Sequence, residues 1–241
     1  MKPIEELFVL TIPKSGSHLI LKCIKLLEKN LSSFPYVIRV GHPGFVGRRA
    51  PGPSKLFSRL SMNPKAKKIL NIRDLRDCYC SAIPYLDKLV ARKQSFIFDK
   101  IWTSLETSEQ KLLYLLKLDH PMPWDLTLTF QAMVELSSGS NVLISRFEEL
   151  VGPSGGGTRS SQLNLISEIV TFLELECSKE IILRIADNLF GGKRIKNPKL
   201  FFHEGKIGKW KLLFNEEHKN IFKERAGRYL IFFGYESDCS W

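Results

Sequence analysis

A short loop at residues 11–17, with the sequence Thr-Ile-Pro-Lys-Ser-Gly-Ser, is the feature that most constrains how this chain folds. An apolar run at Leu7–Leu10 precedes the loop, and a segment with helical periodicity follows it. The unpaired N–H groups and the dipole at a helix N-terminus stabilise a phosphate or sulfonate placed there. Lys14 adds a positive charge, and Gly16 lets the backbone approach a ligand closely. The strand–loop–helix pattern therefore predicts an anion site.

Four apolar runs predict the strands of a sheet: Leu7–Leu10, Tyr36–Val40, Lys68–Ile72 and Val142–Ile144. Segments with helical periodicity separate these runs, which gives the order β-α-β-α-β-α-β. This alternation predicts an α/β fold with a central, mostly parallel sheet flanked by helices. Ligands of such folds bind beyond the carboxyl ends of the strands.

The second half of the chain carries further helix signals. Amphipathic patterns predict helices at Leu165–Leu173 and Ile181–Leu189. A last helix is predicted to start after the N-cap Asn215 and to stop at Gly234. The Gly- and Ser-rich segment Gly152–Ser161 is predicted to be a surface loop inside a single domain that covers residues 1–241.

The formal charge of +11 suits an anionic ligand, a nucleic acid or an acidic membrane surface, and the charge alone does not choose among them. The sequence shows no basic helix with interleaved aromatic residues, so a nucleic-acid partner is not predicted. Neither a transmembrane segment nor a signal peptide is indicated, and five cysteines without metal-ligand spacing predict a cytoplasmic protein with reduced thiols and no metal site.

Three more residues are candidates for the anion site or for catalysis. Arg73 stands at the carboxyl end of the third predicted strand, and Ser81 follows eight residues later, so the two can hold one anion together. The alternative is that Arg73 pairs with a neighbouring carboxylate, Asp74 or Asp77. His42 follows the second predicted strand at the same edge of the sheet. An imidazole titrates near pH 6.5, so His42 is a candidate general base.

These residues together resemble the sulfotransferases that use 3′-phosphoadenosine 5′-phosphosulfate (PAPS). Pro13–Ser17 is similar to that family's Pro-Lys-Ser-Gly-Thr loop, and its lysine precedes the glycine, unlike the order of the nucleotide-triphosphatase motif. Arg73 with Ser81 matches the family's binders of the 3′-phosphate, and His42-Pro43 is similar to the context of its catalytic histidine. The residues around Gly205 resemble its closing motif, Arg-Lys-Gly-x-x-Gly-Asp-Trp-Lys.

The resemblance implies a P-loop-like three-layer fold and transfer of a sulfuryl group from PAPS to a hydroxyl or amine, without a metal. The acceptor would be a small molecule or a glycan or lipid hydroxyl. The implied roles are Lys14 and His42 in catalysis, and the following residues in cofactor binding: Lys14, Ser15, Gly16, Ser17, His18, Arg73, Ser81 and Gly205.

The closing motif departs from the family pattern at three positions. His203 replaces the arginine, Glu204 replaces the lysine, and Lys209 replaces the aspartate. A carboxylate about 4 Å from a phosphate costs about 1 to 4 kcal/mol, depending on the dielectric. Two alternatives therefore stay open: a non-catalytic nucleotide-binding protein of the same fold, and a P-loop kinase, against which the missing Gly-Lys-Ser/Thr order counts.

Overall fold

A computed structural model describes residues 5–42, 63–92, 99–118, 126–190 and 205–241. The chain divides into two compact units. Unit 1 comprises Met1–Arg73 and Pro121–Lys193, and unit 2 comprises Asp74–His120 and Arg194–Trp241. The expectation of one domain over residues 1–241 stays a prediction.

Unit 1 is built on a parallel sheet whose strands are β1 (Glu5–Thr11), β2 (Tyr36–Gly41), β3 (Lys67–Ile72) and β4 (Val142–Arg146). The strand order is β2-β1-β3-β4, and every neighbouring pair is parallel. From β1 the chain adds β2 on one side and β3 on the other, so the order reverses between β1 and β3. In open α/β sheets this switch point, at the carboxyl ends of the strands, is where ligands bind.

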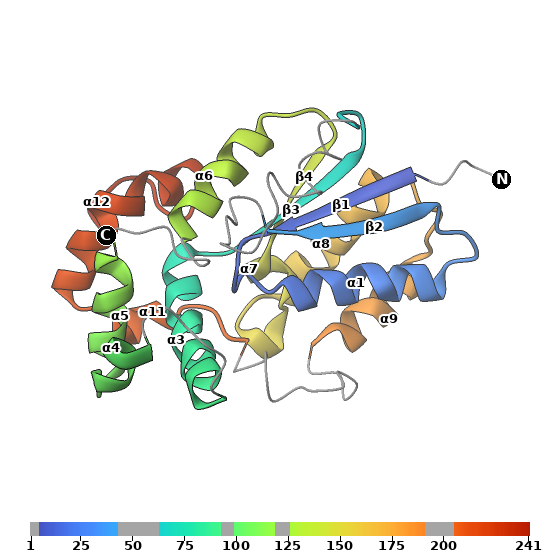
Figure 1. Cartoon of the computed structure of the whole chain (residues 1–241). Coiled ribbons are helices and arrows are strands. Elements are labelled where there is room, and N and C mark those ends of the chain that lie inside the picture. Colours follow the sequence, from blue (N-terminus) through green and yellow to red (C-terminus); the bar gives the residue numbers. More distant parts are fainter. Residues whose placement is uncertain (1–4, 43–62, 93–98, 119–125, 191–204) are drawn as a thin grey trace. The chain divides into compact units, whose positions relative to one another are not determined.

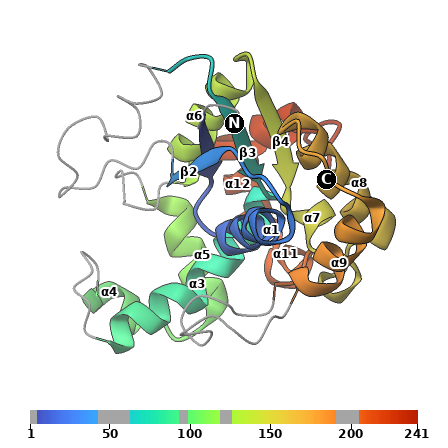
Figure 2. The same cartoon turned by 90° about the vertical axis from the view of Figure 1, so that its right-hand side faces the viewer.

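The α-helices in the described part of unit 1 are α1 (Ser17–Asn30), α6 (Leu126–Ser137), α7 (Phe147–Leu150), α8 (Arg159–Phe172) and α9 (Lys179–Leu189). Figures 1 and 2 show α1, α8 and α9 gathered beside the sheet. Their apolar faces and alternate residues of β1 form one buried cluster, which includes Val9, Ile24, Ile169 and Ile185. The four predicted strands and the flanking helices are therefore confirmed.

The segment Gly152–Ser161 departs from the sequence prediction, because only part of it is a loop. It contains a 3₁₀ turn at Pro153–Gly155, and its last residues form the first turn of α8. The side chain of Thr158 accepts a hydrogen bond from the Ser161 N–H and starts that helix. The helix expected between β2 and β3 falls largely on residues 43–62, which lie outside the described part of the chain.

Unit 2 is helical in its described residues: α3 (Leu75–Ala91), α4 (Asp99–Ser104), α5 (Ser108–Lys117), α11 (Trp210–Leu213) and α12 (Glu216–Phe232). Asn215 is the N-cap of α12, as predicted, and forms a capping box with His218. Gly234 follows the helix in the left-handed conformation (φ 69°), so the predicted stop is confirmed. In the described residues no helix combines the length and the apolar character needed to cross a bilayer.

Candidate functional site

The loop between β1 and α1 has a backbone shape that only a few residues tolerate. Lys14 has φ 68° and Gly16 has φ 86°, both in the left-handed region. The Gly16 carbonyl accepts the Leu19 N–H at 2.8 Å, which opens α1. The N–H groups of Ser17 and His18 come before these first helical hydrogen bonds, and N–H groups in this position of a helix are suited to an anion. The loop thus has the strand–loop–helix form from which an anion site was predicted, and the anion site itself stays a prediction.

A polar network beneath the loop holds this shape. The Asn71 amide donates to the Ser15 carbonyl at 2.8 Å and to Ser15 Oγ at 3.0 Å. Ser15 Oγ donates to the Asn71 carbonyl, and the Ser15 N–H donates to Ile12 O. Ser145 Oγ donates to Asn71 Oδ1 from β4. Ser15 is fully buried, so the structure gives it a scaffold role where the sequence predicts a ligand contact.

Arg73 and Phe147 brace the loop from the neighbouring strand ends. Arg73 Nη1 donates to the Lys14 carbonyl at 3.2 Å, and the guanidinium lies 4.3 Å from the centroid of the Phe147 ring. The same ring closes the space beside Gly16, because a Cβ there would approach Phe147 Cδ2 to 2.4 Å. The loop therefore requires glycine at position 16 for two reasons, its backbone angle and this contact. Phe147 is the first residue of α7, and its role in the loop was not foreseen from the sequence.

His42 reaches the loop from the end of β2. Its Nδ1 lies 2.7 Å from the Thr11 carbonyl oxygen and 3.0 Å from Thr11 Oγ1. A carbonyl oxygen only accepts, so Nδ1 carries the proton and Nε2 of the neutral ring keeps its lone pair. His42 as a residue is exposed. The structure thus brings His42 to the same sheet edge as Lys14, as predicted.

His18, in the first turn of α1, has a lowered pKa. Burial is the main cause, and the positive charges of Lys14, His42 and Lys25 add to it. The folded state therefore favours the neutral imidazole. An anion bound at the loop would offset these positive charges, so its binding is linked to proton uptake by His18.

The lowered pKa of His18 gives a prediction about stability. Below pH about 6.5 the unfolded chain binds a proton at His18 more readily than the folded chain does, so the free energy of unfolding should fall as pH falls. Above that pH, the contribution of His18 to the free energy of unfolding is fully present. Urea unfolding across this range should show a smaller pH slope in His18→Asn than in the unchanged chain. Equal slopes would contradict the assignment.

Ser81 and Gly205 lie in unit 2, where Asp77 organises the segment that contains Gly205. The Asp77 carboxylate accepts the Gly208 N–H at 2.7 Å and the Trp210 N–H at 3.0 Å. Gly205 and Gly208 both have positive φ, 64° and 76°. Asp77 is buried at 1% exposure, so these bonds form in a low-dielectric environment. The sequence offered Asp77 as an alternative ion-pair partner of Arg73, and its role in shaping this turn was missed.

The side chain of Arg76 contacts the same segment. Its guanidinium lies 3.7 Å from the Trp210 ring centroid and 4.2 Å from that of Trp241. It also pairs with Asp74 at 2.8 Å and with Glu236 at 2.6 Å. The side chain of Arg76 is only 2% exposed. The guanidinium is thus buried among two indole rings and two carboxylates. These contacts join α3 to Glu236 and Trp241.

The departures from the closing motif at His203 and Glu204 lie outside the described residues. Lys209, the third departure, is described and stands at the N-cap position of α11, which its side chain does not cap.

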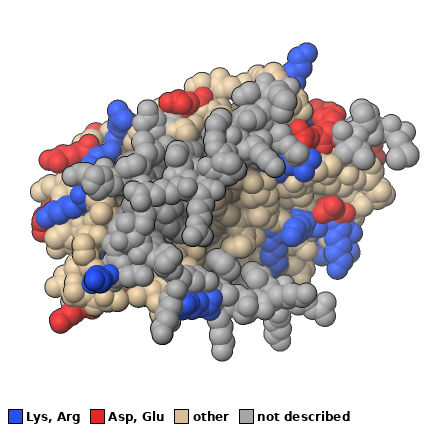
Figure 3. All heavy atoms as spheres, viewed as in Figure 1, with Lys and Arg blue, Asp and Glu red and all other residues tan. Residues whose placement is uncertain are grey.

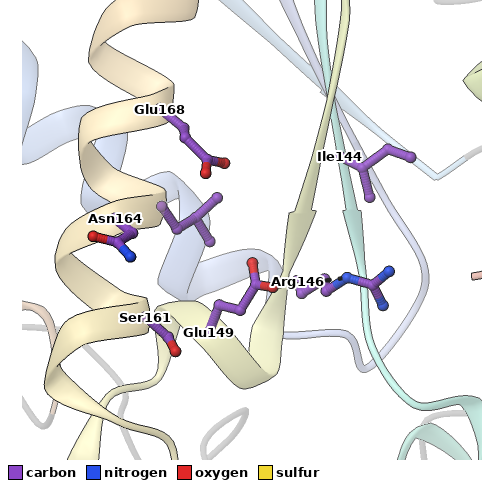
Figure 4. A pocket seen from close by; sticks show the side chains of 7 residues that line it. Ile144, Arg146, Glu149, Ser161, Asn164 and Glu168 are labelled. Carbon is purple, nitrogen blue, oxygen red and sulfur yellow. Dashed lines mark ion pairs between the residues drawn. The ribbon is translucent and has the colours of Figure 1, made fainter. Parts of the chain in front are cut away.

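A separate pocket of about 340 Å³ lies in unit 1, lined by Ile144, Arg146, Glu149, Ser161, Asn164, Leu165 and Glu168. Figure 4 shows the polar side chains of α8 opposite the end of β4. Arg146 and Glu149 are 3.8 Å apart, and burial raises the pKa of Glu149, with a further increase from Glu168. None of the predicted site residues lines this pocket. Its two carboxylates outnumber its one guanidinium, so the lining of this pocket does not favour a phosphate.

Charge is dispersed on the face seen in Figure 3, where basic and acidic side chains of the described residues are interspersed.

The ranges described contain no group of three or more His, Cys, Asp or Glu side chains arranged to hold a metal ion. Cys23, Cys78 and Cys80 are buried, as expected of small apolar side chains.

The fold is that of the sulfotransferases. The mouse sulfotransferase SULT7A1, solved in complex with PAP (adenosine 3′,5′-bisphosphate), superposes with a TM-score of 0.66 at 15% identity, over 98% of this chain and 89% of that chain. Retinol dehydratase superposes with TM-scores of 0.60 in a complex with androsterone and inactive cofactor PAP, and 0.58 in a complex with retinol and PAP. These two comparisons give 14% and 15% identity and cover 95% of this chain and 82% of that one. The sequence matches no protein-family model and no curated protein.

Proposed function

We propose that this protein is a cytoplasmic PAPS-dependent sulfotransferase that transfers a sulfuryl group to a hydroxyl, or an amine, of a small-molecule, glycan or lipid acceptor. One observation carries the proposal: a Pro-Lys-Ser-Gly-Ser loop with a left-handed glycine opens α1 at the switch point of a sheet with the sulfotransferase fold. The solved neighbours support the nucleotide, since their complexes contain PAP. A small apolar acceptor is supported by the androsterone and retinol complexes.

The loop would bind the 5′-phosphosulfate. Lys14 supplies a positive charge, and the N–H groups at the start of α1 donate to the phosphate oxygens. These donors are preorganised, because Asn71, Arg73 and Phe147 hold the loop before any ligand binds. Charge grows on the bridging phosphate oxygen as the sulfuryl group leaves. Fixed donors aimed at that oxygen stabilise the transition state more than the ground state.

His42 would act as the general base. Nε2 takes the proton of the acceptor hydroxyl, and the acceptor oxygen forms a bond to sulfur while the bond from sulfur to the phosphate oxygen breaks. The products are the sulfated acceptor, PAP and a proton held on His42. The chain contributes positioning and electrostatic stabilisation, as in phosphoryl transfer. No metal is part of this proposal.

Arg73, Ser81 and Gly205 would bind the 3′-phosphate of the nucleotide. The role of Arg73 gives a prediction: Arg73→Ala should weaken binding of PAP more than binding of 5′-AMP, which lacks the 3′-phosphate. A charge-assisted hydrogen bond is worth about 1.5–3 kcal/mol, so we expect a selective loss of about tenfold to a hundredfold. Because Arg73 also supports the Lys14 carbonyl, both affinities should fall to some extent. Equal losses for the two nucleotides would remove the 3′-phosphate role.

Calorimetry with the unchanged chain tests the function itself. PAP should bind without a divalent cation, and ATP with Mg²⁺ should bind weakly or not at all. Tight binding of ATP–Mg²⁺ without PAP binding would indicate the phosphotransferase alternative instead. A further outcome is that PAP binds but no sulfated product forms with a panel of phenols, steroids and other alcohols. That result would favour a non-catalytic nucleotide-binding protein, the alternative raised by Glu204 in place of the family's lysine.

A further inference from the structure

Three side chains of unit 1 form a continuous hydrogen-bond chain between the anion loop and the candidate base. Ser17 Oγ lies 2.7 Å from Thr11 Oγ1, and Thr11 Oγ1 lies 3.0 Å from His42 Nδ1. His42 Nδ1 also lies 2.7 Å from the Thr11 carbonyl oxygen. Thr11 is fully buried, at the carboxyl end of the central strand β1. Neither Thr11 nor this chain of contacts was singled out by the sequence motifs.

The direction of each hydrogen bond follows from what the atoms can donate. The Thr11 carbonyl only accepts, so the proton lies on His42 Nδ1. A protonated Nδ1 cannot accept from the Thr11 hydroxyl, so its hydrogen is shared between the Thr11 carbonyl oxygen and Thr11 Oγ1. The hydrogen of the Thr11 hydroxyl is then available for Ser17 Oγ. Ser17 Oγ then has its own hydrogen available for a further acceptor. The chain therefore runs from His42 through Thr11 to Ser17, with each group donating to the next.

We propose that Thr11 is a positioning residue that couples the base to the anion loop. This inference rests on the proposed function. The Thr11 carbonyl fixes the tautomer of His42, and the Thr11 hydroxyl directs the Ser17 O–H toward the 5′-phosphate. When His42 Nε2 takes the acceptor's proton, the ring becomes a cation and its Nδ1–H becomes a stronger donor. Polarisation along the chain then strengthens the Ser17 donor while charge grows on the leaving phosphate oxygen.

Coupling of this kind has a clear advantage for an in-line transfer. Deprotonation of the acceptor and departure of the phosphate occur in one transition state, on opposite sides of the sulfur. A chain of hydrogen bonds that responds to the first event stabilises the second without any movement of the backbone. Thr11 is suited to this role because the carbonyl and the hydroxyl that make the two contacts belong to one rigid, buried residue.

Thr11→Val tests the inference, because valine keeps the branched shape and the backbone carbonyl but removes the hydroxyl. Thr11→Ser is the matched variant that restores the hydroxyl. Calorimetry with PAP should show binding weakened about tenfold in Thr11→Val, the size expected for one charge-assisted hydrogen bond, and within about twofold of the unchanged chain in Thr11→Ser. Unfolding midpoints measured in parallel identify any loss that comes from the fold alone.

A double-mutant cycle with Ser17→Ala separates positioning from a merely structural role. If Thr11 acts through Ser17, adding Thr11→Val to Ser17→Ala should cost no further PAP affinity. Additive losses of about a hundredfold in total would overturn the inference, and so would unchanged PAP binding in Thr11→Val. Absence of PAP binding by the unchanged chain would instead reject the proposed function, and the inference would fall with it.

Discussion

Lys14→Ala is expected to abolish measurable turnover. Loss of one preorganised group that stabilises developing charge lowers kcat by about a hundredfold to a thousandfold, and the loss of a full charge beside the phosphosulfate should reach or exceed that range. Transfer from PAPS to an acceptor already validated with the unchanged chain is the measurement. PAP affinity should fall as well, because the same charge acts on the bound product.

Lys14→Gly provides a matched control for the backbone. Lys14 has φ 68°, a conformation that glycine adopts more readily than alanine or lysine. Both variants lack the amine, and only Lys14→Gly relieves the backbone strain. If the charge is what matters, the two variants should be equally inactive while Lys14→Gly is the more stable. Full activity in either variant would contradict the role of Lys14.

Arg76→Ala is expected to have the largest effect on stability. It leaves Asp74 and Glu236 without their shared cation and removes the group that lies against the rings of Trp210 and Trp241. Removal of one partner of a buried ion pair costs about 3–5 kcal/mol, a large part of the about 5–15 kcal/mol that stabilises a typical domain. Urea unfolding followed by tryptophan fluorescence measures the change directly, since both indole rings contact the guanidinium.

Two further variants make the Arg76 result interpretable. Arg76→Lys keeps the charge but loses the planar group that lies on two rings, so its loss should be intermediate. Lys117→Ala removes an exposed pair with Glu217, whose side chains are 54% and 55% exposed, and should change the free energy of unfolding by about 1 kcal/mol or less. An Arg76→Ala variant as stable as Lys117→Ala would show that the buried cluster contributes little.

The parts of the fold that could be predicted from the sequence are those governed by local patterns. Apolar runs identified the four strands, and the N-cap Asn215 identified the start of α12. The loop at residues 11–17 was found because strand, lysine, glycine and helix follow one another directly in the chain. The start of α8 shows the limit of local patterns: the helix was predicted from Leu165, but it begins at Arg159, after the N-cap Thr158.

Contacts between distant parts of the chain could not be predicted in this way. Asp77 binds backbone N–H groups of Gly208 and Trp210, more than a hundred residues away, and nothing in the local pattern distinguishes it from a surface carboxylate. Phe147 packs against Gly16 for the same kind of reason. The proximity of His42 and Lys14 was anticipated, because parallel strands bring their carboxyl ends to one edge. The roles of the site residues stay proposals.

The ring of Phe147 beside Gly16 also limits how this sequence can change over time. A side chain at position 16 would collide with that ring and would also have to adopt φ 86°, so a smaller residue at position 147 is necessary for a substitution there but not sufficient. A smaller residue at 147 would in turn remove the face on which Arg73 lies. Substitutions at positions 16, 73 and 147 therefore depend on one another, and we expect related chains to vary at these positions together.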